Sequence, residues 1–278
     1  MRPIETFDFV IVGAGSAGCV LADRLTEDGK HSVLLLEYGG SDRSVFVQMP
    51  SALAIPMGMK KYNWFYYTEP EPHLGGRRIH TPRGKVLGGS SSINGLVYVR
   101  GNPQDFDRWE QEGAAGWSYA DVLPYFRRAE THAAGGDHYR GDEGKLQTCY
   151  GTVTNPLHAA WLAAAGEAGY PHTTDINGFQ QEGFGRFDMT VGGGRRSSTA
   201  NAYLRPAMQR RNLTVRTHAL ATSILFDGRR ATGLCYRRGD ILHTVRVRRE
   251  VLVCGGPINS PQLLKLSGLG PAAELKQH

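Results

Sequence analysis

The feature that most constrains the fold lies near the N-terminus, where a short apolar segment leads directly into a glycine turn. Residues 7–12 (FDFVIV) have the length and β-branched composition of a buried parallel strand. Gly13, Gly15 and Gly18 follow in G-x-G-x-x-G spacing, and residues 17–25 predict a helix. In this setting the first glycine permits the tight turn, the second lets the backbone approach a pyrophosphate, and the third lets the helix pack on the strand. We therefore expect phosphate at the start of this helix.

Glycine spacing alone is weak evidence, because 36 of the 278 residues are glycine. The context strengthens it. A second apolar segment, residues 33–36, ends in Glu37, which lies 19 residues after Gly18. A carboxylate that binds a ribose hydroxyl is expected about 20 residues after the glycines. The sequence therefore predicts a dinucleotide site, and Glu37 disfavours NADP because a carboxylate repels a 2′-phosphate.

A second glycine cluster, RGKVLGGSSSINGLVYVRG at residues 83–101, bears on which dinucleotide is bound. One interpretation is a loop that leads into an edge strand. The other is a loop whose backbone lies against a planar ring. Gly88, Gly89 and Gly95 would permit the close approach, and the serine hydroxyls and Asn94 would supply hydrogen bonds. Composition alone does not decide between them.

Two long motifs give the chain a resemblance to a known family. GKVLGGSSSIN at residues 84–94 and GPINSPQLLKLSGLG at residues 256–270 resemble, in this order, the two signature motifs of the glucose-methanol-choline (GMC) oxidoreductases, which depend on FAD. Segments such as KKYNWFYYTEPEP (residues 60–72) and INGFQQEGFGRFDMT (residues 176–190) are similar to the branch that contains choline dehydrogenase. The resemblance covers essentially the whole chain.

The resemblance implies a set of FAD contacts. Some relatives attach the flavin to a histidine at the position of Ile93, and isoleucine cannot form that bond, so noncovalent FAD is expected. Tyr38 departs from the family pattern, which has a small residue there, and it is expected to crowd the adenosine pocket. The implied contacts are the phosphates at Gly13, Gly15, Ser16, Ala17 and Gly18, the adenosine ribose at Glu37, the isoalloxazine or pyrophosphate at Val86, Ser90, Asn94, Gly95 and Val97, and the adenine at Ala221.

The expected fold is α/β: a Rossmann-like FAD-binding domain with a parallel sheet, joined to the start of a smaller α+β substrate domain. The expected division is residues 1–145 and 192–278 for the FAD-binding domain and residues 146–191 for the substrate domain. Asn155 is suited to cap a helix within residues 154–170, with Pro156 in its first turn. Further patterns predict a helix within residues 195–211, strands at 213–217, 223–226, 231–236 and 242–247, and a strand, glycine turn and helix within 249–268.

The resemblance implies an alcohol dehydrogenase that transfers hydride from a primary alcohol to flavin. Such chemistry needs a base for the hydroxyl proton and a flavin that accepts the hydride. The family's catalytic histidine lies well beyond the second motif, and none of the ten histidines of this chain matches that segment, so no catalytic residue is assigned. The alternative is a non-catalytic FAD-binding fragment that associates with the C-terminal part or with itself. A nicotinamide dehydrogenase is disfavoured by the second glycine cluster, and the alcohol and the electron acceptor are left open.

Charge and cysteine content exclude other classes. The net charge is +6, but the arginines fall in scattered pairs without interleaved aromatic residues, which argues against nucleic-acid binding. The four cysteines form no CxxC pair, so neither a metal site nor a disulfide framework is predicted. No segment approaches the roughly 18 apolar residues of a membrane span, and no signal-peptide core is present. The expected location is the cytoplasm, with peripheral membrane association left open.

Overall fold

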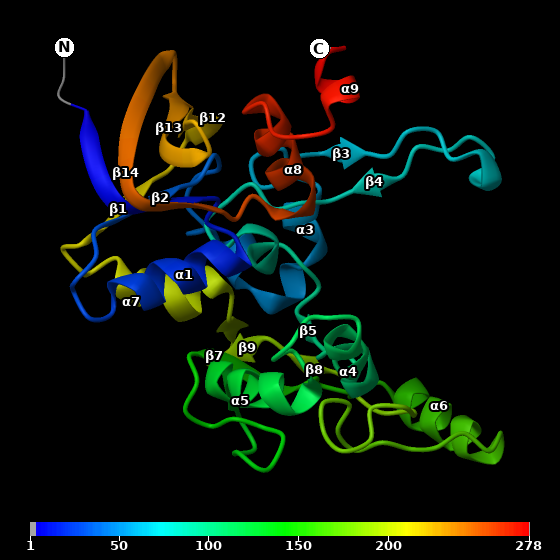
Figure 1. Ribbon diagram of the computed structural model, residues 1–278. Helices are drawn as coiled ribbons and strands as arrows, with labels where there is room; N and C mark the ends of the chain where they lie inside the picture. Colours follow the sequence, from blue (N-terminus) through cyan, green and yellow to red (C-terminus); the bar gives the residue numbers. More distant parts are fainter. Residues whose placement is uncertain (1–3, 278) are drawn as a thin grey trace. The chain divides into compact units, whose positions relative to one another are not determined.

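The computed structural model describes residues 4–277 and divides into two compact units (Figure 1). The first unit comprises the residues up to Gly95 together with those from Ser198 onward. The second unit is Leu96–Ser197. This division differs from the expected one, because residues 96–145 and 192–197 belong with the second unit, whereas the sequence grouped them with the FAD-binding domain. The assignment of the two units to cofactor and substrate stays a prediction.

A six-stranded sheet forms the centre of the first unit. Four of its strands are parallel, as expected, whereas β13 and β12 run antiparallel to their neighbours. The connections explain this difference, because residues 228–229 and 239–240 form two-residue turns, and such short turns join only antiparallel strands. In spatial order the strands are β11 (Leu213–Arg216), β2 (Val33–Leu36), β1 (Glu5–Val12), β14 (Ile241–Val253), β13 (Arg230–Arg238) and β12 (Ala219–Asp227).

The core of the first unit follows the apolar strands. All four residues of β2 are buried, as expected for a parallel strand covered on both faces. Val10 and Leu34 pack in one apolar cluster with Leu234 and Tyr236 of β13. This packing fixes the carboxyl ends of β1 and β2, from which the glycine turn and Glu37 emerge.

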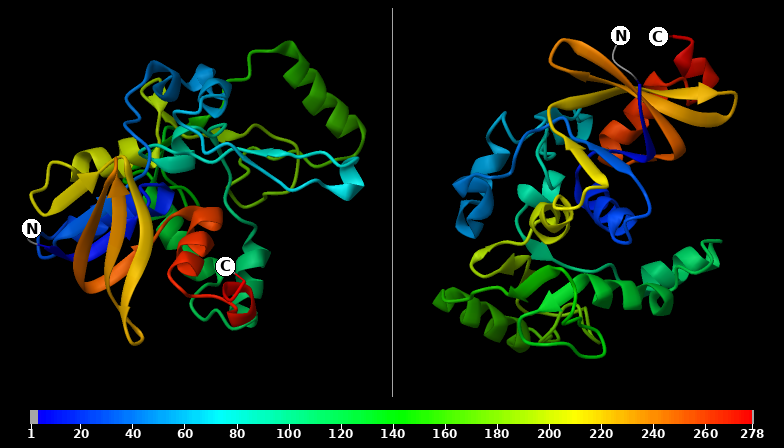
Figure 2. Two further views of the ribbon diagram at one scale, coloured as in Figure 1. Left: turned by 90° about the horizontal axis from the view of Figure 1, so that it is seen from above. Right: turned by 90° about the vertical axis from the view of Figure 1, so that its left-hand side faces the viewer.

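Helices and short elements complete the first unit. Helices α1 (Ser16–Thr26) and α7 (Arg205–Ala207) lie side by side, and α8 (Gly256–Leu266) packs against β12 (Figures 1 and 2). The helix expected within residues 195–211 forms only at 200–207, and its first part, η4 (Ala200–Leu204), is a π-helix. The remaining elements are α2 (Val45–Gln48), η1 (Pro50–Ala52), α3 (Ala54–Met57), η2 (Pro72–Leu74), η3 (Gly89–Ser92), α9 (Ala272–Leu275) and the β3–β4 hairpin (Tyr66–Tyr67, His80–Thr81).

The second unit contains a four-stranded sheet and three helices. Helix α6 (Pro156–Glu167) begins as predicted, because the Asn155 side chain accepts a hydrogen bond from the Leu157 amide at 3.0 Å and Pro156 occupies the first turn. The sheet order is β5 (Val97–Tyr98), β8 (Asp188–Met189), β7 (Leu146–Tyr150) and β6 (Glu130–His132), accompanied by the pair β9 (Val191–Gly192) and β10 (Arg195–Arg196) and by helices α4 (Pro103–Gln111) and α5 (Tyr119–Ala129).

A buried ionic cluster lies within this second sheet. The Arg140 guanidinium binds Glu130 at 2.6 Å and Asp188 at 2.7 Å, and Arg100 binds the other oxygen of Glu130 at 2.7 Å. Burial disfavours the charge on Arg140, but the carboxylates of Glu130 and Asp188 outweigh this effect and raise the pKa of Arg140. The cluster joins β6 to β8 through charges that are almost completely removed from water.

Candidate cofactor site

The first glycine motif forms a tight turn between β1 and α1. Gly13 has a φ of +98°, and a Cβ atom on it would lie 2.5 Å from the carbonyl oxygen of Cys254. A Cβ atom on Gly18 would collide with the carbonyl oxygen of Gly13. Both positions therefore require glycine for packing, which agrees with the roles expected for the first and third glycines of the motif.

Gly15 differs from its neighbours because it faces open space. A Cβ atom on Gly15 would have no neighbour closer than 4.0 Å. Gly15 is the N-cap of α1, no side chain caps this helix, and its first turn carries no acidic residue. The first turn of a helix leaves N–H groups without intrahelical partners, and the helix dipole places positive potential there. Ser16 and Ala17 thus present an uncapped helix start that fits an anionic group.

The second glycine motif packs directly on the first. The Gly88 amide donates to the carbonyl oxygen of Ala14 at 2.7 Å. A Cβ atom on Gly89 would lie 2.6 Å from the Cα atom of Gly15, so the two backbones meet without side chains between them. Because Gly89 also has a φ of +54°, glycine is required for conformation and for approach. The two glycine loops therefore form one continuous backbone surface beside the start of α1.

A third segment completes this surface. The Cys254 amide donates to the carbonyl oxygen of Val12 at 2.8 Å, and Gly255 lies against Gly13. Gly255 is the N-cap of α8, which likewise has no side-chain cap. Two helix starts, those of α1 and α8, therefore lie next to each other. The sequence predicts this segment only as a family motif, without a site residue, although the glycine pair Gly255–Gly256 between a strand and a helix is a signal of such a site.

Glu37 holds the first motif in place from the end of β2. Its carboxylate accepts hydrogen bonds from the Ala14 amide at 3.0 Å and from the Gly39 amide at 2.7 Å. The side chain is buried, and burial raises the pKa of Glu37 to about 7 despite these hydrogen bonds and a further one from the Tyr38 backbone. A carboxylate has about four acceptor sites on its two oxygens, so the group keeps acceptor capacity for a ligand hydroxyl.

Ser90 and Ile93, both in the second glycine motif, are held by contacts with other residues of the first unit. Ile93 is 2% exposed and packs in an apolar cluster with Val47, Tyr62 and Val86. Ser90 accepts a hydrogen bond from the Gly84 amide at 3.1 Å, so this hydroxyl organises the second loop.

The remaining predicted contacts are distributed between the two units. Asn94 and Gly95 follow the second glycine loop, with the Asn94 amide donating to the Ser90 carbonyl oxygen at 2.9 Å. Ala221 lies on β12 opposite Tyr236. Val97 belongs to the second unit, on β5, and its part in the site stays a prediction.

An aromatic stack follows Glu37. The ring of Tyr38 stacks on Trp64 at a centroid distance of 5.0 Å, and Trp64 stacks on Tyr66 at 5.7 Å. The Tyr66 hydroxyl donates to the Asn259 side chain of α8 at 2.5 Å. The unexpected tyrosine at position 38 therefore has a packing role, joining the end of β2 to the β3–β4 segment.

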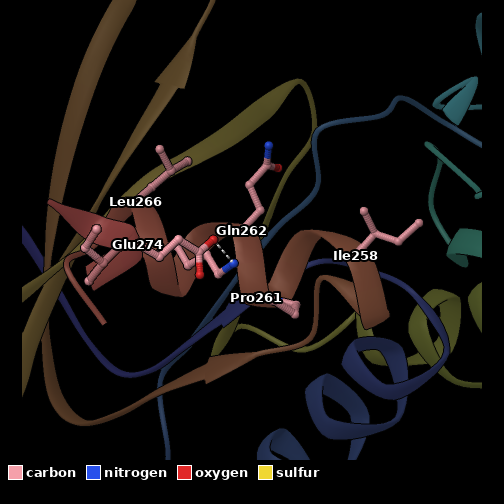
Figure 3. Close-up of a pocket in the computed structure, with 7 residues that line it drawn as sticks. Ile258, Pro261, Gln262, Leu266 and Glu274 are labelled. Carbon is pink, nitrogen blue, oxygen red and sulfur yellow. Dashed lines mark hydrogen bonds and ion pairs between the residues drawn. The ribbon is translucent and has the colours of Figure 1, made fainter. Parts of the chain in front are cut away.

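A separate cavity of about 360 Å³ is lined by residues of α8 and α9 (Figure 3). Lys265 and Glu274 form an ion pair at its edge. None of the predicted cofactor residues lines it, so we do not assign the cofactor to this cavity. Its lining consists of Ile258, Pro261, Gln262, Lys265, Leu266, Glu274 and Leu275.

The described residues contain neither a metal centre of clustered side chains nor a membrane-spanning helix. Within residues 4–277, no group of three or more histidine, cysteine, aspartate or glutamate side chains is arranged to hold a metal ion. Over the same range, no helix has both the length and the apolar character needed to cross a membrane.

Comparison with known proteins agrees with this geometry. The family model described as GMC oxidoreductase matches residues 7–278. The oxygen-dependent choline dehydrogenases of Photobacterium profundum and Vibrio vulnificus are each 55% identical to the chain over 98% of its length. The match covers 48% and 49% of those proteins, so the chain spans about half the length of the curated relatives it matches.

Solved structures show the same fold. The crystal structure of pyridoxine 4-oxidase from Mesorbium loti superposes with a TM-score of 0.92 at 33% identity, covering 97% of this chain and 53% of that one. An FAD-dependent oxidoreductase from Chaetomium thermophilum superposes with a TM-score of 0.91 at 31% identity, covering 98% of this chain and 49% of that one.

Proposed function

The chain belongs to the GMC oxidoreductase family, and from that premise we propose that its first unit binds FAD with the pyrophosphate at the start of α1. The observation that carries the proposal is the contact between Gly89 and Gly15, which leaves a side-chain-free backbone surface beside an uncapped helix start. Such a surface suits a phosphate group, because N–H groups can approach it closely and the helix dipole favours its charge.

The other predicted residues take their roles from this placement. Gly13, Gly15, Ser16, Ala17 and Gly18 would hold the pyrophosphate. Glu37 would accept a ribose hydroxyl, and Ala221 would contact the adenine through its backbone. Val86, Ser90, Asn94, Gly95 and Val97 would contact the isoalloxazine or the pyrophosphate. The Ile93 side chain carries no nucleophile and lies in an apolar cluster, which supports noncovalent binding.

We further propose that the complete enzyme oxidises a primary alcohol of the choline type. The named relatives are choline dehydrogenases, and the chain covers about half of each. When bound, FAD supplies the hydride acceptor for the alcohol carbon. This chain would bind and orient that cofactor, and we assign it no base for the hydroxyl proton. The alternative is a flavin-binding protein without turnover.

A flavin titration tests the proposal. We expect the purified chain to bind FAD and, after acid precipitation, to release all of it into the supernatant, because no covalent bond is formed. Anaerobic addition of choline should leave the flavin absorbance unchanged. Choline added together with a second polypeptide, which corresponds to the half of a choline dehydrogenase that this chain does not match, should bleach it. Absence of FAD binding would contradict the proposal. Bleaching by choline with this chain alone would show that one of its own residues acts as the base.

The raised pKa of Glu37 predicts that FAD binding depends on pH. A ribose hydroxyl donates to the ionised carboxylate, which becomes the major form only as the pH rises through about 7. FAD should therefore bind more tightly with rising pH, by about tenfold between pH 6 and pH 8 if only the ionised form binds. The dissociation constant from flavin fluorescence titrations at several pH values measures this.

The Glu37→Gln variant should bind FAD more weakly and without this pH dependence, because the amide does not titrate. Glu27→Gln is the matched control, since Glu27 is exposed and pairs with Arg24 at the surface. A Glu37→Gln profile with the same slope as the unmodified chain would assign the pH dependence to another group.

A further inference from the structure

His218 occupies a strained position at the edge of the proposed adenosine site. It lies in the two-residue connection between β11 and β12 with a φ of +55°. Left-handed backbone is uncommon for residues with a side chain, and glycine would adopt it without cost. Strained residues persist where the surrounding structure fixes them, and they cluster at ligand sites. This strain therefore raises the question of what the side chain of His218 contacts.

The backbone around His218 is tied to the loop that follows Glu37. The His218 amide donates to the carbonyl oxygen of Gly39 at 3.1 Å, and the next amide, of Ala219, donates to the carbonyl oxygen of Glu37 at 2.9 Å. The connection thus lies at the carboxyl ends of the parallel strands β2 and β11. Ligands of open α/β sheets bind beyond the carboxyl ends of the strands.

The imidazole of His218 is exposed and lies over the Gly40 backbone. A Cβ atom on Gly40 would come within 3.0 Å of the ring carbon Cε1 and within 3.1 Å of Nε2. None of the hydrogen bonds found among residues 4–277 involves this ring. A flat ring whose nitrogen atoms make no hydrogen bond within residues 4–277 is therefore held beside the loop that follows Glu37.

We propose that His218 contacts the adenosine half of the dinucleotide through its imidazole ring. This inference rests on the proposed function and adds a residue to that site. An imidazole offers a face for packing on a purine and a nitrogen for hydrogen bonding to it or to a ribose hydroxyl. His218 acts in binding and in selecting dinucleotide over mononucleotide, because a mononucleotide has no adenosine.

The experiment uses His218→Gly, which removes the ring and suits the observed φ. The apo variant should unfold at the same temperature as the unmodified chain or higher, because the left-handed strain is removed. Its dissociation constant for FAD should nevertheless rise about tenfold. The inhibition constant of ADP, measured as a competitor of FAD binding, should rise by a similar factor. Its affinity for FMN should not change.

His31→Ala is the matched control. His31 lies just before β2, at the opposite end of the strand that leads to Glu37, and its ring contacts Phe9 edge-on. This control should leave the ADP constant unchanged. Unchanged FAD and ADP constants in His218→Gly would overturn the inference while the proposed function stands. Equal weakening of FAD and FMN would assign His218 a structural role. If the unmodified chain bound neither FAD nor ADP, the proposed function would fall and the inference with it.

Discussion

Replacing Gly15 by leucine is expected to abolish FAD binding while leaving the chain folded. Gly15 has φ and ψ of −78° and −163°, an extended conformation that residues with side chains adopt readily. A Cβ atom there would meet no atom closer than 4.0 Å, so a side chain can leave the backbone at this position without a collision at its first atom. The leucine would instead occupy the space beside the start of α1, where we place the pyrophosphate. Flavin content after purification, with circular dichroism to verify folding, measures the effect.

Two other glycine substitutions make this result specific. Gly18→Ala should unfold the first unit, because the added methyl group would collide with the Gly13 carbonyl oxygen. Gly166→Ala, in helix α6, has open space around it and should change neither flavin binding nor folding. A Gly15→Leu protein that is folded and carries a full complement of FAD would show that the phosphate site lies elsewhere.

Replacing Arg140 by methionine should destabilise the second unit by about 3–5 kcal/mol, which is typical for breaking a buried ion pair on one side. Arg140 contacts Glu130 at 2.6 Å and Asp188 at 2.7 Å, and all three side chains are at most 3% exposed. Without the guanidinium, the carboxylates of Glu130 and Asp188 would remain buried with too little positive charge. Of these two carboxylates, Arg100 pairs with that of Glu130. Protonation of a carboxylate or local opening of the sheet would then be needed to relieve the unbalanced negative charge.

Hydrogen exchange gives a suitable measurement, because the two units need not unfold together. Faster exchange should be confined to amides of the second unit, above all those of β6 and β7. Arg108→Met is the control, because Arg108 pairs with Asp105 at the surface and such pairs contribute at most about 1 kcal/mol. Equal exchange in the Arg140→Met and Arg108→Met proteins would mean that the buried cluster does not stabilise the second sheet.

The local elements around the site could be predicted from short stretches of the sequence. The strand, glycine turn and helix at residues 7–25 could be predicted because a tight turn needs particular backbone angles and a buried strand needs apolar residues, and both requirements appear within a few neighbouring positions. The Asn155 cap of α6 and the strands β11, β12 and β13 follow from the same short-range rules, whereas the two strands expected at 242–247 and after residue 249 form the single strand β14. The two long motifs also sufficed to identify the family.

The contacts between these elements could not be predicted in this way, because they form between distant parts of the chain. Gly89 meets Gly15, and Gly255 meets Gly13, across separations that no local spacing encodes. The grouping of residues 96–197 into one unit, and the buried Glu130–Arg140–Asp188 cluster within it, likewise depend on segments far apart in the chain. Sequence patterns report the conformational preferences of neighbouring residues, whereas the burial of a charge or the meeting of two backbones depends on how the whole chain packs.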